Sequence, residues 1–99
     1  MYFISVFTQY NKAKKGFPPD LGSYRTVGYY TNKKAAITAV LENHCDIFEY
    51  TYIYAVVEHI EPGLYNLATD RWFFKWNLET SQYEPIESFV DQYGNYAFG

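Results

Sequence analysis

Few side chains in this chain could take part in catalysis, because it has one cysteine and two histidines among 99 residues. His44, Cys45 and Asp46 are consecutive, and they include the residue types of a thiolate nucleophile and its base. Neighbours at a helix end point in different directions, however, and a nucleophile must reach its base within hydrogen-bond distance. We interpret His44 as favouring a helix C-terminus and Cys45 as a small packed residue, and we predict no catalytic residue.

A metal site is the second chemistry to consider, because His59 lies close to Glu58 and Glu61. Alternation along a strand sends His59 and Glu58 to opposite faces. A zinc site needs three or four converging ligands, and two histidines with one cysteine cannot supply them without carboxylates from elsewhere. The spacing of the eleven acids singles out no catalytic pair. We therefore predict no metal, no cofactor and no enzymatic activity.

Basic residues suggest a phosphate site instead. Lys33 and Lys34 begin a predicted helix, where the macrodipole disfavours positive charge and acids are the usual choice. Two lysines beside the free N–H groups of a first turn resemble the way an anion site is built. Arg25 on the preceding strand would add to this site, as would three lysines of a nearby loop, Lys12, Lys14 and Lys15. The alternative is that both helix lysines are simply solvated.

Aromatic residues make up 22% of the chain, more ring surface than one small domain can bury. Trp72, Phe74 and Trp76 alternate along one predicted strand, and we group them with Tyr52 and Tyr54 of another. Rings on one sheet face can stack nucleobases or form the hot spot of a protein interface. The alternative is that Trp72, Phe74 and Trp76 are the core beneath the helix. Whether this strand is core or interface stays open at this point.

The hydrophobic pattern predicts an α+β fold, with a single largely antiparallel β-sheet and one main helix packed on one face, in β-β-α-β-β-β order. The helix is predicted over 33–44, with Thr31 and Asn32 as its N-cap pair. Gly28 predicts a bulge or a close packing contact in its strand. The predicted strands cover 2–8, which should be central, 24–31, 51–60, 71–77 and 82–86, with a mobile loop over 11–23 and a weaker strand signal at 64–67. Residues 87–93 are predicted as one or two helical turns, and 95–99 as a tail or a last strand.

Length predicts one α+β domain over residues 1–99, since a chain of this size can bury enough surface to fold alone. The net charge of −3 hides an asymmetry. Residues 1–34 carry six lysines and arginines against one acid, and residues 35–99 carry two against ten acids. A chain without a continuous basic track is poorly suited to polymeric nucleic acid. The absence of a long apolar run or a basic leader predicts a soluble, cytoplasmic protein with no membrane partner.

Several segments together carry a resemblance to known proteins. These are the Gly28-Tyr29-Tyr30-Thr31 segment before the helix, the run from Tyr54 to Tyr65, and the downstream Trp72–Trp76 and Tyr83–Ile86 segments. In this order the chain resembles a family of short uncharacterised proteins found in bacterial genomes and in their phages and prophages. The resemblance implies a small accessory protein of bacteria or mobile elements, and it carries over no functional residue. Small phage proteins of this kind often act against host defence or host machinery.

The function predicted from these features is a non-enzymatic binding module, which inhibits or tethers a host defence protein through an aromatic surface. One short helix can cover only part of one sheet face, so the other face must meet the C-terminal segment, a second copy or a partner. We therefore also expect a homo-oligomer. The alternative function is a sequestering protein for a small nucleotide signal, held by aromatic stacking and by the lysine-rich helix N-terminus.

Overall fold

The computed structural model describes residues 1–9, 22–64 and 67–86. Predictions that fall on 10–21, 65–66 and 87–99, including most of the loop over 11–23 and both C-terminal segments, lie outside the described residues. The elements in chain order are β1 (Tyr2–Phe7), β2 (Tyr24–Tyr30), α1 (Lys33–Leu41), the 3₁₀ helix η1 (His44–Asp46), β3 (Tyr54–His59), β4 (Asp70–Asn77) and β5 (Gln82–Ile86).

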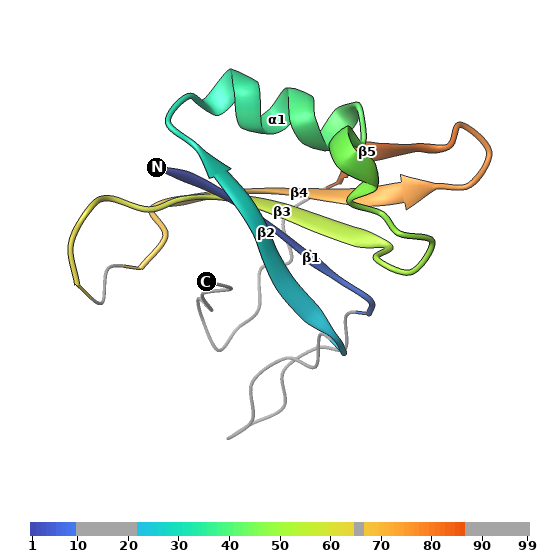
Figure 1. Cartoon of the computed structure of the whole chain (residues 1–99), viewed down its shortest axis with the longest axis horizontal. Helices are drawn as coiled ribbons and strands as arrows, with labels where there is room; N and C mark the ends of the chain where they lie inside the picture. The colour runs from blue at the N-terminus through green and yellow to red at the C-terminus, as the bar shows by residue number, and fades with distance from the viewer. Residues whose placement is uncertain (10–21, 65–66, 87–99) are drawn as a thin grey trace.

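The five strands form one sheet in the order β2-β1-β3-β4-β5, and every neighbouring pair is antiparallel. Helix α1 lies across one face of the sheet, and β2 and β5 form its two edges (Figure 1). This arrangement confirms the predicted α+β class with a single antiparallel sheet. It also confirms the central position of β1, whose side chains are buried on both faces from Ile4 to Phe7.

The bulge predicted at Gly28 lies beside it. Ile4 pairs with Gly28 and Ser5 pairs with Thr26, so Val27 is the extra residue of β2. A Cβ atom built on Gly28 would meet no atom within 4 Å, which means that glycine is not needed there to admit a close neighbour. The bulge bends and twists the edge strand, and a twisted edge is harder to extend by another strand.

Helix α1 begins where its cap was predicted. Asn32 has extended backbone angles, and its Oδ1 accepts a hydrogen bond from the Ala35 N–H at 3.1 Å. An asparagine at this position satisfies one of the free donors of the first turn. The helix packs three small or branched residues into the core, Ala36, Ala39 and Val40.

The helix ends at Leu41, three residues before the predicted end at 44. Asn43 takes a left-handed conformation (φ 49°), and its side chain then organises the next turn. Its Nδ2 donates to Asp46 Oδ1 at 3.1 Å, and its Oδ1 accepts from the Phe48 N–H at 3.0 Å. These local hydrogen bonds compete with helical continuation and replace it. His44 and Cys45 consequently lie in η1 rather than in the helix.

Strand β3 begins at Tyr54 rather than at residue 51. The Phe48 carbonyl accepts hydrogen bonds from the N–H groups of Thr51 and Tyr52, which keeps this stretch in a turn. The predicted strands 71–77 and 82–86 correspond to β4 and β5, which pair as an antiparallel hairpin with Asn77 opposite Gln82. A weaker strand signal was predicted at 64–67. The structure describes residues 64 and 67 of this segment, and neither lies in a strand.

The two faces of the sheet differ in what they bury. The helix face holds the main core, which includes Ile4, Val6, Val57 and Phe74. The opposite face holds a smaller buried cluster of Phe7, Val56 and Phe73. An ion pair between Glu58 and Arg71 is also buried, on neighbouring strands.

Candidate functional site

Trp72, Phe74 and Trp76 lie on the helix face of β4. Phe74 is buried, and the two tryptophans are half-buried against the main core cluster. The sequence left open whether these three rings form a binding surface or the core beneath the helix, and the structure supports the core. These rings stabilise the fold and leave only part of their surface for a ligand.

Tyr52 and Tyr54 do not share a face. Tyr52 precedes β3 and packs against the main core, whereas Tyr54 packs against the cluster on the opposite face. The turn ending at Tyr52 breaks the strand alternation that would have put both rings on one side. Tyr54 stacks on Phe7 with ring centroids 5.2 Å apart, and the Lys75 ammonium lies 5.9 Å from its centroid. The five rings grouped from the sequence consequently do not form one surface.

Tyr83 of β5 completes the aromatic part of the core. The Phe48 and Trp76 rings stack with centroids 3.9 Å apart, and the Tyr83 ring meets Trp76 edge-on at 5.1 Å. The Tyr83 hydroxyl donates a hydrogen bond to the Tyr52 carbonyl. Burial raises the pKa of the Tyr83 hydroxyl, and the nearby charge of Asp46 raises it further. The hydroxyl therefore remains protonated, as its donor role requires.

We expect Tyr83→Phe to lower the free energy of unfolding by about 1–3 kcal/mol, because a partly buried carbonyl loses its donor. The wild-type protein binds this proton more tightly when folded than when unfolded, so it should lose stability as the pH rises above about 10. Urea denaturation of both proteins at neutral pH and above pH 10 measures both effects. Equal alkaline losses in wild type and variant would contradict the assignment of this effect to Tyr83.

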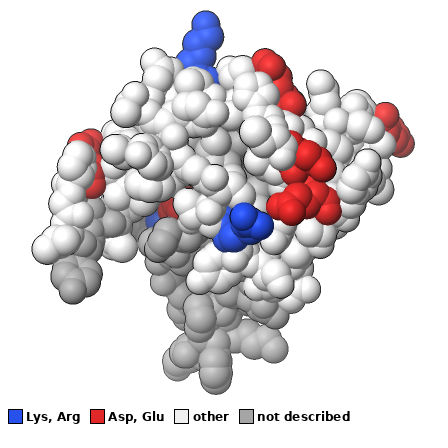
Figure 2. Space-filling view, viewed as in Figure 1, with Lys and Arg blue, Asp and Glu red and all other residues white. Residues whose placement is uncertain are grey.

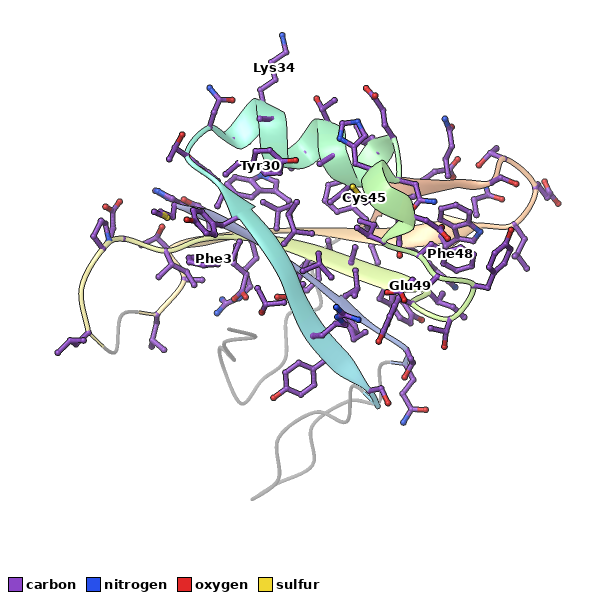
Figure 3. The ribbon with its side chains drawn as sticks, viewed as in Figure 1. Phe3, Tyr30, Lys34, Cys45, Phe48 and Glu49 are labelled. Atoms are coloured by element: carbon purple, nitrogen blue, oxygen red, sulfur yellow. The ribbon has the colours of Figure 1, made fainter. Side chains whose placement is uncertain are left out.

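Arg25, Lys33 and Lys34, the described basic residues of the predicted phosphate site, lie apart, whereas Lys12, Lys14 and Lys15 fall outside the described residues. Lys33 places its ammonium 4.4 Å from the centroid of the Trp72 ring, over β4. Lys34 points away from the sheet into solvent (Figure 3). Arg25 lies on β2, at the other side of the sheet, and its guanidinium is 3.6 Å from the Glu49 carboxylate. The structure thus brings Lys33 together with Trp72 and separates it from the other two cations.

A second aromatic set was missed in the sequence. Tyr24, Tyr29 and Tyr30 are 56%, 58% and 37% exposed, and all three belong to the edge strand β2. We call these three residues the β2 tyrosine edge. The signal in the sequence was the polarity of this strand, since Arg25 and Thr26 are consecutive polar residues, whereas β1 is apolar apart from Ser5 and β3 is apolar from Tyr54 to Val57.

Packing behind the β2 tyrosine edge holds at least one of its rings. Tyr29 is opposite Phe3 of β1, and the two ring centroids are 5.6 Å apart with a tilt of 44°. Phe3 lies on the side of the sheet away from α1 (Figure 3). A ring supported in this way can contact a partner without much further ordering.

Acidic side chains gather on one side of the face seen in Figure 2, where basic side chains are sparse. Glu42 and Glu49 flank the turn around η1, and both are exposed. His44 Nε2 lies 3.1 Å from Glu42 Oε1. This part of the surface can repel or attract a charged partner approaching the neighbouring β2 strand.

The residues considered as a thiolate nucleophile and its base lie in η1, whereas His59, considered for metal binding, lies at the end of β3. Cys45 is exposed. His59 stacks on Tyr2 with ring centroids 4.5 Å apart, and it lies 3.5 Å from the Glu61 carboxylate and 3.9 Å from that of Asp70.

Within 1–9, 22–64 and 67–86, no group of three or more His, Cys, Asp or Glu side chains is placed to hold a metal ion. Among the same residues, no helix has the length and apolar character needed to cross a membrane.

The β2 tyrosine edge and the Lys33–Trp72 contact are therefore the two candidate binding features of the described chain. The resemblance to bacterial and phage proteins stays a prediction. Comparison of the chain with protein-family models, with curated proteins and with solved structures found no match.

Proposed function

We propose that this protein is a non-enzymatic binding module that holds another protein through the β2 tyrosine edge. The observation that carries the proposal is the exposure of Tyr24 and Tyr29, each more than half exposed on a strand at the edge of the sheet. Tyrosine is enriched among interface residues that contribute most to affinity. Its ring supplies a large contact area while few torsions have to be ordered on binding.

The support behind Tyr29 favours this surface over an isolated exposed ring. Phe3 backs Tyr29 from β1, so the ring starts from a restricted position. Binding costs less free energy when the contacting side chains are already ordered. Tyr50 is the useful contrast in position and exposure, not in ring support: its ring lies 5.8 Å from that of Phe48, but it is 90% exposed and lies in the turn before β3 rather than on an edge strand.

The partner we propose is a host protein of a bacterium, and the module inhibits or tethers it. The resemblance to phage and prophage proteins supports this choice, and a component of host defence is the first candidate. The sequence-based alternative, a nucleotide-sequestering protein, ranks second because it needs several cations at one place. Lys33, Lys34 and Arg25 lie apart in the described fold.

Photo-crosslinking in a bacterial host tests the proposal. A benzophenone amino acid replaces Tyr29 in one variant and Tyr50 in a matched control, because both are exposed tyrosines of the same chain. We expect a discrete crosslinked protein from position 29 and none from position 50. Crosslinking of the same protein from both positions, or from position 50 alone, would contradict the assignment of the surface.

We also expect the protein to form a homodimer or a higher oligomer, because α1 covers only one face of an aromatic-rich sheet. Light scattering at high micromolar concentration should give at least twice the 11.7 kDa chain mass. A strict monomer under these conditions would contradict this expectation.

A further inference from the structure

A cavity of about 330 Å³ lies between α1 and the β4–β5 hairpin. Its volume is near the lower end of the range of about 300–1,000 Å³ found for small-molecule sites. Helix α1 contributes Lys33 and Ile37 to the lining. The hairpin contributes apolar walls, among them Trp72, Phe74, Pro85 and Ile86.

Among the residues that the structure describes, the cavity carries one positive charge without a matching acid, that of Lys33. Arg71 also lines it, but the Arg71 Nε donates to Glu58 Oε2 at 3.0 Å, so Glu58 offsets its charge. Lys33 makes no ion pair within the part of the chain that the structure describes, and the first turn of α1 holds no acid. Its ammonium instead lies over the Trp72 ring, 4.4 Å from the centroid. A cation held on an aromatic face is positioned to pair with an incoming anion.

The lining also indicates which anion fits. Among the described lining residues there is no Ser, Thr, Asn or Gln, so none of their neutral side chains can accept a hydrogen bond from a sugar hydroxyl or a base edge, and the Trp72 indole N–H is their one neutral side-chain donor. Aromatic and aliphatic walls favour a flat apolar body. One ammonium matches one negative charge better than the two of a phosphate monoester.

We propose that this cavity binds a small planar aromatic monoanion, whose ring contacts the Trp72 and Pro85 walls and whose carboxylate pairs with the Lys33 ammonium. The N–H groups of the helix start are not needed to bind this anion, and the Asn32 side chain already accepts a hydrogen bond from the Ala35 N–H. The site is separate from the proposed protein surface. It lies over β4 and β5, whereas the β2 tyrosine edge is beyond β1 and β3.

Calorimetric titration with 2-naphthoate and with its neutral isostere 2-naphthamide tests the proposal. We expect naphthoate to bind about tenfold or more tightly than the amide, since only naphthoate can pair with the ammonium. Lys33→Gln should remove this difference. Lys34→Gln is the matched control, because the neighbouring lysine points into solvent, and it should leave the difference unchanged.

Trp72→Phe provides a second variant and Trp76→Phe its control, because of the two tryptophans only Trp72 lines this cavity. Quenching of tryptophan fluorescence by naphthoate should persist in the Trp76 variant and disappear in the Trp72 variant. Equal binding of naphthoate and naphthamide, no binding of either, or tighter binding of AMP than of naphthoate would overturn the proposal. None of these results bears on crosslinking from position 29, so failure here is distinguishable from failure of the proposed function.

Discussion

Replacing Arg71 by methionine is expected to lower the free energy of unfolding by about 3–5 kcal/mol, because it leaves a buried carboxylate without its guanidinium. The Glu58 side chain is 0% exposed and that of Arg71 is 11% exposed. Arg71 Nε donates to Glu58 Oε2 at 3.0 Å between neighbouring strands. Removing one member of a buried ion pair leaves the charge of the other less compensated, which costs free energy.

Urea denaturation of matched variants measures this effect. The Arg25–Glu49 pair is the control, since its side chains are 57% and 49% exposed and its closest atoms are 3.6 Å apart. Arg25→Met should cost less than about 1 kcal/mol, as exposed pairs do. The double variant Glu58→Leu with Arg71→Met should recover most of the loss, because both charges are removed together. Equal losses from Arg71→Met and Arg25→Met would contradict the burial of the Glu58–Arg71 pair.

Replacing Tyr29 by alanine is expected to weaken binding of the crosslinked partner by about 2 kcal/mol or more, which is about 30-fold in affinity. The reason is the loss of a supported ring at the proposed interface. Calorimetry with the purified partner measures the change. Thermal unfolding of the variant alone separates an effect on affinity from an effect on folding.

Tyr50→Ala is the control for this prediction, because its ring is 90% exposed and lies outside β2. Its effect on affinity should stay within about 0.5 kcal/mol, as is usual for surface changes away from a contact. A larger loss from Tyr50→Ala than from Tyr29→Ala would move the interface to the turn around η1.

The elements of the sheet could be predicted because their signals are local. The central strand β1 is apolar on both faces, and its burial from Ile4 to Phe7 follows from that pattern. The Asn32 cap determined the start of α1, and the predicted strands 71–77 and 82–86 match β4 and β5 closely. Each of these features depends on a few neighbouring residues, so the sequence pattern was sufficient.

The end of α1 and the start of β3 could not be predicted, because side chains decide both. Asn43 turns the backbone into a left-handed conformation and bonds forward to Asp46 and Phe48. The turn from Phe48 to Tyr52 then separates Tyr52 from Tyr54, which alternation had placed together. Such hydrogen bonds compete with regular structure at positions that propensity does not single out.

The candidate sites depend on sheet order, which no local pattern encodes. The rings of β4 are core because α1 packs over them, and the tyrosines of β2 are exposed because β2 lies at the edge. Lys33 meets Trp72 only because β3 and β4 follow β1 in the sheet. Composition alone correctly indicated that some rings must remain outside the core, without indicating which.

The most direct test of the central claim is to follow the tyrosine ring signals by NMR while the partner is added. The chain has twelve tyrosines, and assigned ¹³C-labelled rings report on each of them without any substitution. The proposed function predicts that the signals of Tyr24, Tyr29 and Tyr30 shift or broaden, while those of the buried Tyr83 and the exposed Tyr50 stay unchanged. Unchanged signals from all three β2 tyrosines in a complex that has formed would contradict the claim that this protein binds its partner through the β2 tyrosine edge.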